Sequence, residues 1–233
     1  MCTAVHVAKL SRSFYDRPTL DVARDLIGKV LVHERRGVRT SGVIVEAEAY
    51  IGESDPACHA APGLTRRNAP LYGLPGYAYV YLNYGIHPLV NAVTEARGVP
   101  AAVLIRALDP LEGLAAMRRR RARAATGRRA RDASGIGPHD LCRGPGNVTR
   151  AMGITLHENR ADLCGDRLFI EDAGVPIAQA IAWAPRVGIS VGAERPWRAY
   201  LEGHPAVSAG RASRTSRRGR QPSTGRAYSD SRR

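Results

Sequence analysis

The segment Val43–Tyr50 constrains this chain more than any other, because it predicts a core strand that carries reactive groups on its second face. Side chains alternate between the two faces of a β-strand. One face would carry the apolar residues Val43, Val45, Ala47 and Ala49. The other face would carry Ile44, Glu46, Glu48 and Tyr50. Two carboxylates beside an aromatic ring suit a pocket that holds a flat substrate and activates a water. They suit simple packing poorly.

The bulk composition predicts one soluble domain. The chain has 233 residues and is 44% hydrophobic, which is enough for a substantial core. It has no apolar run long enough to cross a bilayer, and its N-terminus lacks the charged-then-apolar order of a signal peptide. The four cysteines include no CxxC pair, which favours inert thiols over a zinc site or a disulfide framework. We therefore expect an intracellular protein without a membrane partner.

Positive charge is concentrated in two arginine-rich blocks, although the formal net charge of the whole chain is +14. Residues 118–131 contain eight arginines and no acid, and residues 209–233 contain eight arginines and one aspartate. The rest of the chain is therefore close to neutral. Such blocks attract polyanions, with nucleic acid as the first candidate. Because the chain has only two lysines, an arginine-biased composition is an equally good explanation. We expect 209–233 to be a disordered tail.

The expected elements mix helices and strands. Helices are predicted at 19–27, from 109 into the first arginine block, and at 144–152. Thr19 would cap the first helix, and Asp109 with Pro110 would begin the second. Strands are predicted at 29–33, 43–50, 77–84, 89–94, 101–107, 167–171 and 186–191. The stretch 51–76 is rich in proline and glycine, and an irregular loop of that length is usually functional.

Four of the nine tyrosines fall in the segment 76–85. In a regular strand Tyr77, Tyr79 and Tyr81 would share one face, and Tyr84 would lie on the other face near a hairpin tip. This pattern predicts a stacking surface beside Tyr50, and base–aromatic stacking is worth about 1–3 kcal/mol per base. Tyrosine is also a good β-former, so a strand of ordinary composition remains an alternative.

Other polar residues have a functional and a structural interpretation. His59 follows Tyr50 closely enough to fold over the same face, or it is an ordinary loop histidine. Arg67 would contact a phosphate or lie in solvent. Arg106 ends an apolar strand, where a structural ion pair competes with a phosphate contact. Gly144 precedes a helix start that would present N–H groups to an anion or serve only as a turn. The sequence contains no phosphate-binding loop, dinucleotide fingerprint or zinc-deaminase motif.

In combination these motifs resemble the alkyladenine DNA glycosylase family, the 3-methyladenine glycosylases that are unrelated to the helix-hairpin-helix type. The resemblance runs from about Leu10 to about Ser208. The residues that carry it are Glu46-Ala47-Glu48-Ala49-Tyr50, His59, Arg67-Asn68, Tyr79-Val80-Tyr81, Tyr84-Gly85, Asn91, Leu104–Leu108 and Arg143-Gly144-Pro145.

The resemblance implies a single α+β domain, with a curved antiparallel β-sheet flanked by helices and a protruding β-hairpin. The glycosylase domain would span 1–208, with an arginine-rich insertion at about 118–135. The family binds duplex DNA from the minor-groove side and flips a damaged nucleotide into a pocket. We therefore expect a monomer whose partner is double-stranded DNA with damaged purines, in the bacterial cytoplasm and associated with the nucleoid.

The resemblance also implies roles for individual residues. Glu48 would be the catalytic carboxylate, with Arg106 beside the attacking water and the flipped nucleotide's phosphate. The base would be held by Tyr50, His59, Tyr81 and Asn91. Tyr84 would be inserted into the gap left in the duplex. The remaining candidate contacts to the DNA backbone are Arg67, Arg143 and Gly144.

These roles describe a monofunctional DNA glycosylase that starts base excision repair without a cofactor or metal. Base removal passes through an oxocarbenium-like sugar, which a nearby carboxylate can stabilise while it activates water. The class of lesion would be alkylated or deaminated purines such as 3-methyladenine, 7-methylguanine and hypoxanthine. Lys9 and Lys29 lie outside the pocket elements, so we expect hydrolysis without a Schiff base or strand cleavage. We expect Glu46 to have a structural role.

Two alternatives stay open at this point. The first is a nucleic-acid-binding protein of the same fold without activity, which the presence of Glu48 disfavours. The second is a sugar-active hydrolase that uses Glu46 and Glu48, which leaves the arginine blocks and the tyrosine hairpin unexplained.

Overall fold

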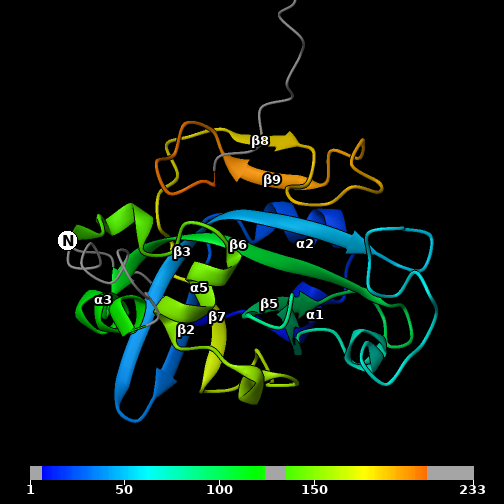
Figure 1. Ribbon diagram of the computed structural model, residues 1–233, viewed down its shortest axis with the longest axis horizontal. Coiled ribbons are helices and arrows are strands. Elements are labelled where there is room, and N and C mark those ends of the chain that lie inside the picture. The colour runs from blue at the N-terminus through cyan, green and yellow to red at the C-terminus, as the bar shows by residue number, and fades with distance from the viewer. Residues whose placement is uncertain (1–6, 124–134, 209–233) are drawn as a thin grey trace, which may run out of the picture.

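Nine strands form one antiparallel sheet in the computed structural model, which describes residues 7–123 and 135–208 (Figure 1). Seven strands follow in the order β1-β7-β2-β3-β6-β5-β4, while β9 pairs with β3 and β8 pairs with β9. The strands are β1 (Ala8–Lys9), β2 (Val30–Arg35), β3 (Val38–Ile51), β4 (Ala78–Asn83), β5 (His87–Val93), β6 (Ala101–Glu112), β7 (Leu168–Asp172), β8 (Ile181–Ala184) and β9 (Arg198–Leu201). The predicted tail, 209–233, and residues 124–134 of the predicted insertion lie outside the described residues.

Short helices cover parts of this sheet. They are α1 (Arg12–Tyr15), α2 (Thr19–Asp25), α3 (Leu114–Arg123) and α5 (Pro145–Met152), with 3-10 turns at Ala69–Tyr72, Pro138–Asp140 and Leu156–Glu158. Helix α2 contacts β3, β6 and β9, whereas α5 contacts β5 and β6 and also packs against α3. The chain is therefore the mixed α+β domain with an antiparallel sheet that was predicted. Among the described residues, no helix has the length and apolar character needed to cross a membrane.

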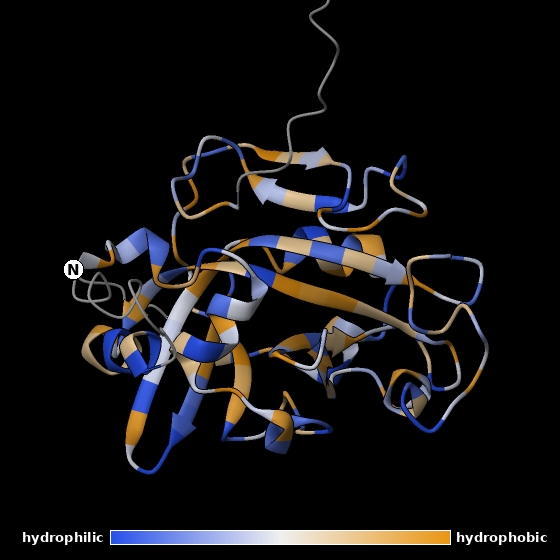
Figure 2. Cartoon of the chain, viewed as in Figure 1, coloured by the Kyte–Doolittle hydropathy of each residue, from blue (hydrophilic) through white to orange (hydrophobic). Residues whose placement is uncertain are grey.

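The apolar core is continuous along the centre of the sheet. Its fully buried members include Ile44, Ile105, Leu108 and Met152, which come from β3, β6 and α5. Figure 2 shows the same distribution, with β6 apolar along much of its length and the turn end of the β2–β3 hairpin mostly hydrophilic. A second, smaller cluster lies under the loop that follows β3, and its members are Cys58, Ala60, Leu71, Tyr79, Val93 and Ala102.

Strand β3 is irregular at the position that matters most. The expected strand is confirmed, but the β3–β6 register shifts between Ile44 and Glu46 and again between Glu46 and Ala47. Ile44 lies in the apolar core together with Val43 and Val45, so the core takes side chains from both predicted faces of the strand. The second shift leaves Arg106 without a Cα partner in β3. Bulges of this kind re-aim side chains next to active sites, and here one brings Arg106 to the two glutamates.

The other expected strands near 29–33, 77–84, 89–94, 101–107 and 167–171 are confirmed, as are the helices near 19–27 and 144–152. The helix predicted to begin at Asp109 is wrong, because β6 continues to Glu112 and α3 begins at Leu114. Asp109 pairs with Val43, and the Glu112 carboxylate accepts hydrogen bonds from Ser41 and Arg39. Tertiary pairing therefore overrides a capping pattern that is favourable only locally.

Two further predictions are corrected by the structure. The strand expected at 186–191 is irregular chain, and the strands of this region are β8 and β9 on either side of it. Gly188 and Gly192 have positive φ there, and Arg186 is held by an ion pair with Asp55 instead of a strand ladder. At α2 the N-cap is Pro18, and the Thr19 hydroxyl bonds to Thr94 and Glu95.

Candidate active site

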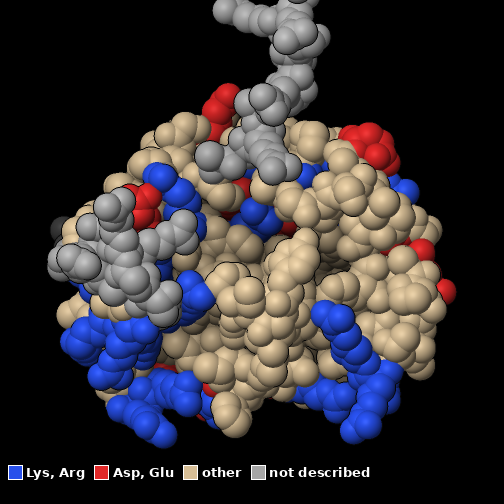
Figure 3. Space-filling model, in the orientation of Figure 1, with Lys and Arg blue, Asp and Glu red and all other residues tan. Residues whose placement is uncertain are grey.

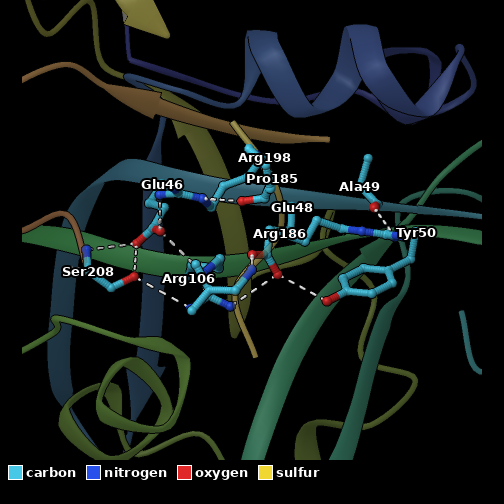
Figure 4. Close-up of polar contacts among 10 residues, drawn as sticks. Glu46, Glu48, Ala49, Tyr50, Arg106, Pro185, Arg186, Arg198 and Ser208 are labelled. Carbon is cyan, nitrogen blue, oxygen red and sulfur yellow. Dashed lines mark hydrogen bonds and ion pairs between the residues drawn. The ribbon is translucent and has the colours of Figure 1, made fainter. Parts of the chain in front are cut away.

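Glu48 is a fully buried carboxylate with three hydrogen-bond donors around it. Its Oε1 accepts from the Val187 backbone N–H at 2.7 Å, and its Oε2 accepts from Arg106 Nη1 and the Tyr50 hydroxyl, each at 3.0 Å (Figure 4). A carboxylate has about four acceptor positions, so one position has no donor among the described residues. Burial raises the pKa of Glu48 despite the opposing effects of Arg106, Val187 and Tyr50. A raised pKa makes the ionised form a stronger general base.

Arg106 joins Glu48 to Glu46. Its Nε donates to Glu46 Oε1 at 3.3 Å while its Nη1 donates to Glu48, and the side chain is almost completely buried. Glu46 Oε1 also accepts from Arg198 Nη1 at 3.0 Å. Two glutamates and two arginines therefore form a neutral buried group, which we call the polar wall (Glu46, Glu48, Arg106 and Arg198). Burial alone would lower the pKa of Arg106, but Glu48 and Glu46 raise it, so Arg106 stays charged.

A cavity of about 420 Å³ opens beside the polar wall. It lies within the size range of small-molecule sites. Its lining combines aromatic, apolar and polar groups, namely Tyr50, Ala57, Cys58, His59, Leu71, Tyr79, Tyr81, Asn83, Tyr84, Leu89, Asn91, Ala102, Leu104, Arg106, Pro145, Val187, Gly188 and Ile189. The predicted pocket residues Tyr50, His59, Tyr81 and Asn91 thus share one cavity with Arg106. A flat ligand in it would lie near the hydroxyl of Tyr50, which contacts Glu48.

Three rings form the aromatic wall of this cavity (His59, Tyr79 and Tyr81). The Tyr79 and Tyr81 rings stack with centroids 5.3 Å apart, and His59 meets Tyr81 edge-on at 4.4 Å. His59 Nδ1 is 2.9 Å from the Tyr79 hydroxyl, which fixes the imidazole orientation. Burial lowers the pKa of His59 and raises that of Tyr79 and Tyr81 to about 12. The aromatic wall is therefore uncharged at neutral pH and does not repel a cationic base.

Tyr50 is held from behind by Arg186. The Arg186 guanidinium lies 4.7 Å from the Tyr50 ring centroid and donates to Asp55 Oδ2 at 2.6 Å and to the Ala49 carbonyl at 3.0 Å. The side chains of Arg186 and Asp55 are both fully buried. This pair ties the loop after β3 to the irregular chain that begins at Pro185. It thereby holds the Val187 N–H in position against Glu48.

Asn91 on β5 is almost completely buried, and its Nδ2 donates to the Tyr79 carbonyl at 2.9 Å. That hydrogen bond assigns the amide nitrogen to the strand backbone and fixes the side chain. Asn91 is therefore a rigid part of the cavity lining, and its Oδ1 is the acceptor that remains for a ligand.

The β4–β5 hairpin carries Tyr84 at its tip. Tyr84 has φ +49° and Gly85 has φ +68°, and the Ile86 N–H donates to the Asn83 carbonyl at 3.0 Å. Two positive φ values in succession are typical of a type I′ hairpin turn. The Tyr84 side chain is 86% exposed while it also borders the cavity. A large apolar group held outward in a strained conformation suggests a binding function.

The three predicted backbone contacts differ in their surroundings. Arg67 is exposed, and its Nη2 lies 3.4 Å from the Leu82 carbonyl. Arg143 forms an ion pair with Asp140 at 2.9 Å and donates to the Pro205 carbonyl. Gly144 has φ +89° and caps α5. Arg67 therefore has one weak contact within the protein, whereas Arg143 has an ion pair and a hydrogen bond.

The structure confirms part of the predicted tyrosine surface and adds residues that the sequence did not reveal. Tyr79 lines the cavity, as the tyrosine pattern predicts, although the resemblance gave it no role. Tyr77 does not line the cavity, since it pairs with Asp162 and stacks under Arg12, so the predicted three-tyrosine surface reduces to two. The Val187 N–H and the side chains of Arg186, Arg198 and Ser208 come from a region with no recognisable motif. Among residues 7–123 and 135–208, no group of three or more histidines, cysteines or acids is arranged to hold a metal.

Comparison with known proteins agrees with this geometry. A model of the methylpurine-DNA glycosylase family matches residues 13–205. A relative from Methanocella arvoryzae is 47% identical over 203 residues, which cover 85% of this chain and 95% of the relative. A relative from Chlorobium phaeobacteroides is 46% identical over 194 residues, which cover 83% of this chain and 92% of the relative. Each carries the name "putative 3-methyladenine DNA glycosylase".

The family model and the relatives define an N-glycosyl hydrolase that acts on DNA, and the fold and site agree with this class. The chain belongs to the methylpurine-DNA glycosylase family, which confirms the resemblance inferred from the sequence.

Proposed function

We propose that this protein flips a damaged purine out of duplex DNA into the cavity and hydrolyses its N-glycosidic bond with a water that Glu48 activates. The observation that carries the proposal is the buried carboxylate of Glu48, which accepts hydrogen bonds from Tyr50, Arg106 and Val187, three residues that line the cavity. The lesion class is alkylated or deaminated purines, including 3-methyladenine, 7-methylguanine and hypoxanthine.

The proposed reaction uses one general base, which is Glu48. The water oxygen forms a bond to C1′ while the C1′–N bond breaks, and the water proton passes to Glu48. The bonding electrons leave with the base, so a cationic alkylated purine departs as a neutral molecule and needs no general acid. A neutral lesion such as hypoxanthine departs as an anion and takes up a proton from water. The negative charge of Glu48 also stabilises the positive charge that develops on the sugar. No side chain forms a covalent bond to the sugar, and the strand stays intact.

Binding is divided among the other residues. His59, Tyr79 and Tyr81 stack against the flipped base, together with Tyr50. Tyr84 occupies the space that the base leaves, which offsets the few kcal/mol that flipping costs. Arg67 is a candidate phosphate contact. On the face shown in Figure 3, lysine and arginine side chains gather on two sides of an uncharged surface, one group lying where Figure 1 shows α3 and the β2–β3 hairpin. This distribution supports contact with the two strands of a duplex by one monomer.

Base release tests the proposal. The protein is incubated with matched duplexes that carry 3-methyladenine, 7-methylguanine, hypoxanthine or an undamaged purine, and the free base is measured. We expect release of damaged bases at least 100-fold faster than of the undamaged base, unchanged by EDTA and without strand breaks. A folded protein that releases none of them would refute the proposal, and inhibition by EDTA would refute its metal-free chemistry.

A further inference from the structure

Ser208 lies at the end of the described chain and contacts the polar wall (Figure 4). Its hydroxyl donates to Glu46 Oε2 and lies 3.5 Å from Arg106 Nη2. Its backbone N–H donates to the same Glu46 oxygen at 2.9 Å. Ser208 is therefore linked to both members of the Glu46–Arg106 pair, although it does not line the cavity.

The contacts of Glu46 show that it acts only through its neighbours. It accepts from Arg106 and Arg198 on one oxygen and from the Ser208 N–H and hydroxyl on the other. Four bonds use the acceptor capacity of a carboxylate, and Glu46 is fully buried. No position remains on it for water or substrate. What Glu46 and Ser208 can influence is the orientation of Arg106.

The three guanidinium nitrogens of Arg106 each have a different partner. Nε contacts Glu46, Nη1 contacts Glu48 and Nη2 contacts Ser208. Three partners in the plane of one guanidinium leave it a single orientation. Without the third partner, the group can rotate about the two that remain. The distance from Nη1 to Glu48 would then be less well defined.

The segment that carries Ser208 is held by other contacts. Arg143 donates to the Pro205 carbonyl, His204 Nε2 lies 3.5 Å from Asp109 Oδ2, and Ala206 is fully buried. The Ser208 N–H also has its own bond to Glu46. Removal of the hydroxyl alone therefore leaves the segment in place.

We propose that Ser208 is a positioning residue of the glycosylase: its hydroxyl bridges Arg106 and Glu46 and so fixes the guanidinium that faces Glu48. The proposal rests on the proposed hydrolysis at Glu48. Through this bridge, the C-terminal segment completes the polar wall although it never touches the substrate. The hydroxyl should affect the chemical step and leave DNA affinity unchanged.

The matched variants Ser208→Ala and Ser208→Thr test the proposal, because only the second keeps a hydroxyl. Base release is measured with enzyme in excess over the lesion duplex that the wild type cleaves fastest, together with affinity for that duplex and thermal unfolding. Loss of one hydrogen bond to a charged group corresponds to roughly a 10-fold change. We expect Ser208→Ala to reduce the maximal rate about 10-fold with unchanged half-saturation, and Ser208→Thr to stay within about threefold of the wild type.

The pH profile separates positioning from a charge effect. Glu48 is faced by Arg106 from β6, Glu46 and Tyr50 from β3, Arg198 from β9, and the Val187 N–H with Arg186 behind it. Ser208→Ala changes none of these charges, so the pH at which the rate falls should stay where it is in the wild type. A Ser208→Ala rate equal to that of the wild type would overturn the proposal. A rate loss matched by lost affinity or by equal damage in Ser208→Thr would also overturn it. A wild type that releases no base would instead reject the proposed function itself.

Discussion

The polar wall beside the cavity and the aromatic wall that lines it are built on different principles. The polar wall is a closed set of ion pairs in which each charge is buried and compensated. The aromatic wall is a set of neutral rings that contact each other and leave their remaining surface to the cavity. The first arrangement holds the Glu48 carboxylate in one geometry, whereas the second offers area for stacking. We therefore expect a change in the polar wall to alter mainly the rate of base release, and a change in the aromatic wall to alter mainly the affinity for the lesion duplex.

Glu46 and Glu48 show the same contrast within one strand. They are two residues apart and both fully buried. Glu46 has four donors and no free acceptor position, while Glu48 has three donors and one free position. Because the two residues are of the same type, it is this difference in partners that supports the proposed roles, structural for Glu46 and catalytic for Glu48.

The largest expected effect concerns the buried pair of Asp55 and Arg186, which ties the loop after β3 to the chain that begins at Pro185. Asp55→Ala should lower the free energy of unfolding by about 3–5 kcal/mol, because Arg186 is left as an uncompensated buried charge. Chemical denaturation measures this loss. The control is Asp21→Ala, since Asp21 and Arg24 form an exposed pair that should be worth at most about 1 kcal/mol. Equal losses of unfolding free energy in the two variants would show that the buried pair stabilises the protein no more than the exposed pair does.

The Asp55 effect should depend on pH. Burial would raise the pKa of Asp55, but Arg186 and two backbone N–H groups lower it below its usual value. A lowered carboxyl pKa gives stability that is complete above the unfolded pKa of about 3.9 and is lost as the pH falls through the folded pKa. The stability gap between wild type and Asp55→Ala should therefore be constant from about pH 5 to 8 and should narrow in acid. A gap that widens in acid would contradict this assignment.

The next effect tests the aromatic wall. Tyr81→Leu should raise the concentration needed for half-maximal base release by about 10-fold or more, since stacking is worth about 1–3 kcal/mol per base. The maximal single-turnover rate should change less, because the hydrogen-bond donors to Glu48 are Tyr50, Arg106 and Val187. Tyr77→Leu is the matched control, since Tyr77 belongs to the same run but lies outside the cavity. A larger loss in rate than in affinity would show that the two walls do not divide binding from chemistry.

A smaller effect concerns the charge of Glu46. Burial raises the pKa of Glu48 and the negative charge of Glu46 adds to this rise. Glu46→Gln should therefore move the acid limb of the single-turnover pH profile to lower pH, while the maximal rate falls because Arg106 loses an anchor. If the maximal rate fell with no movement of the acid limb, Glu46 would act only through geometry.

The smallest effect concerns residues outside the described structure. Deletion of 209–233 should leave base release from a short duplex unchanged at low salt, while it reduces the salt dependence of binding. Each lost phosphate contact should reduce the log–log slope by about 0.9. Titrations of both proteins at several salt concentrations measure the slopes. If the two proteins had the same salt slope, an arginine-biased composition would be the better explanation of the arginines in 209–233.

The sequence predicted the parts of the site that lie on regular strands with a local pattern. Glu48 and Tyr50 are two residues apart on β3, and Tyr79 and Tyr81 are two residues apart on β4. Spacing alone therefore predicted that each pair shares one face of its strand. The resemblance then brought His59 and Asn91 to the same place, and the shared cavity agrees with it.

What the sequence could not predict depends on long-range contacts. The bulge at Arg106 arises from the register between β3 and β6. The Val187 N–H and Ser208 reach Glu48 and Glu46 from more than a hundred residues away in the chain. The prediction of a helix that begins at Asp109 was wrong for the same reason, because pairing of this segment with β3 outweighs a locally favourable helix start. No local pattern encodes these contacts.

The most direct test of the central claim is single-turnover base release by Glu48→Gln, with affinity for the same lesion duplex measured in parallel. The amide keeps the shape of the side chain but cannot take a proton from water. We predict a rate at least 1000-fold below that of the wild type, which corresponds to about 4 kcal/mol of transition-state stabilisation, with affinity unchanged within about threefold. A Glu48→Gln variant that releases the base at the wild-type rate would show that Glu48 is not the catalytic base.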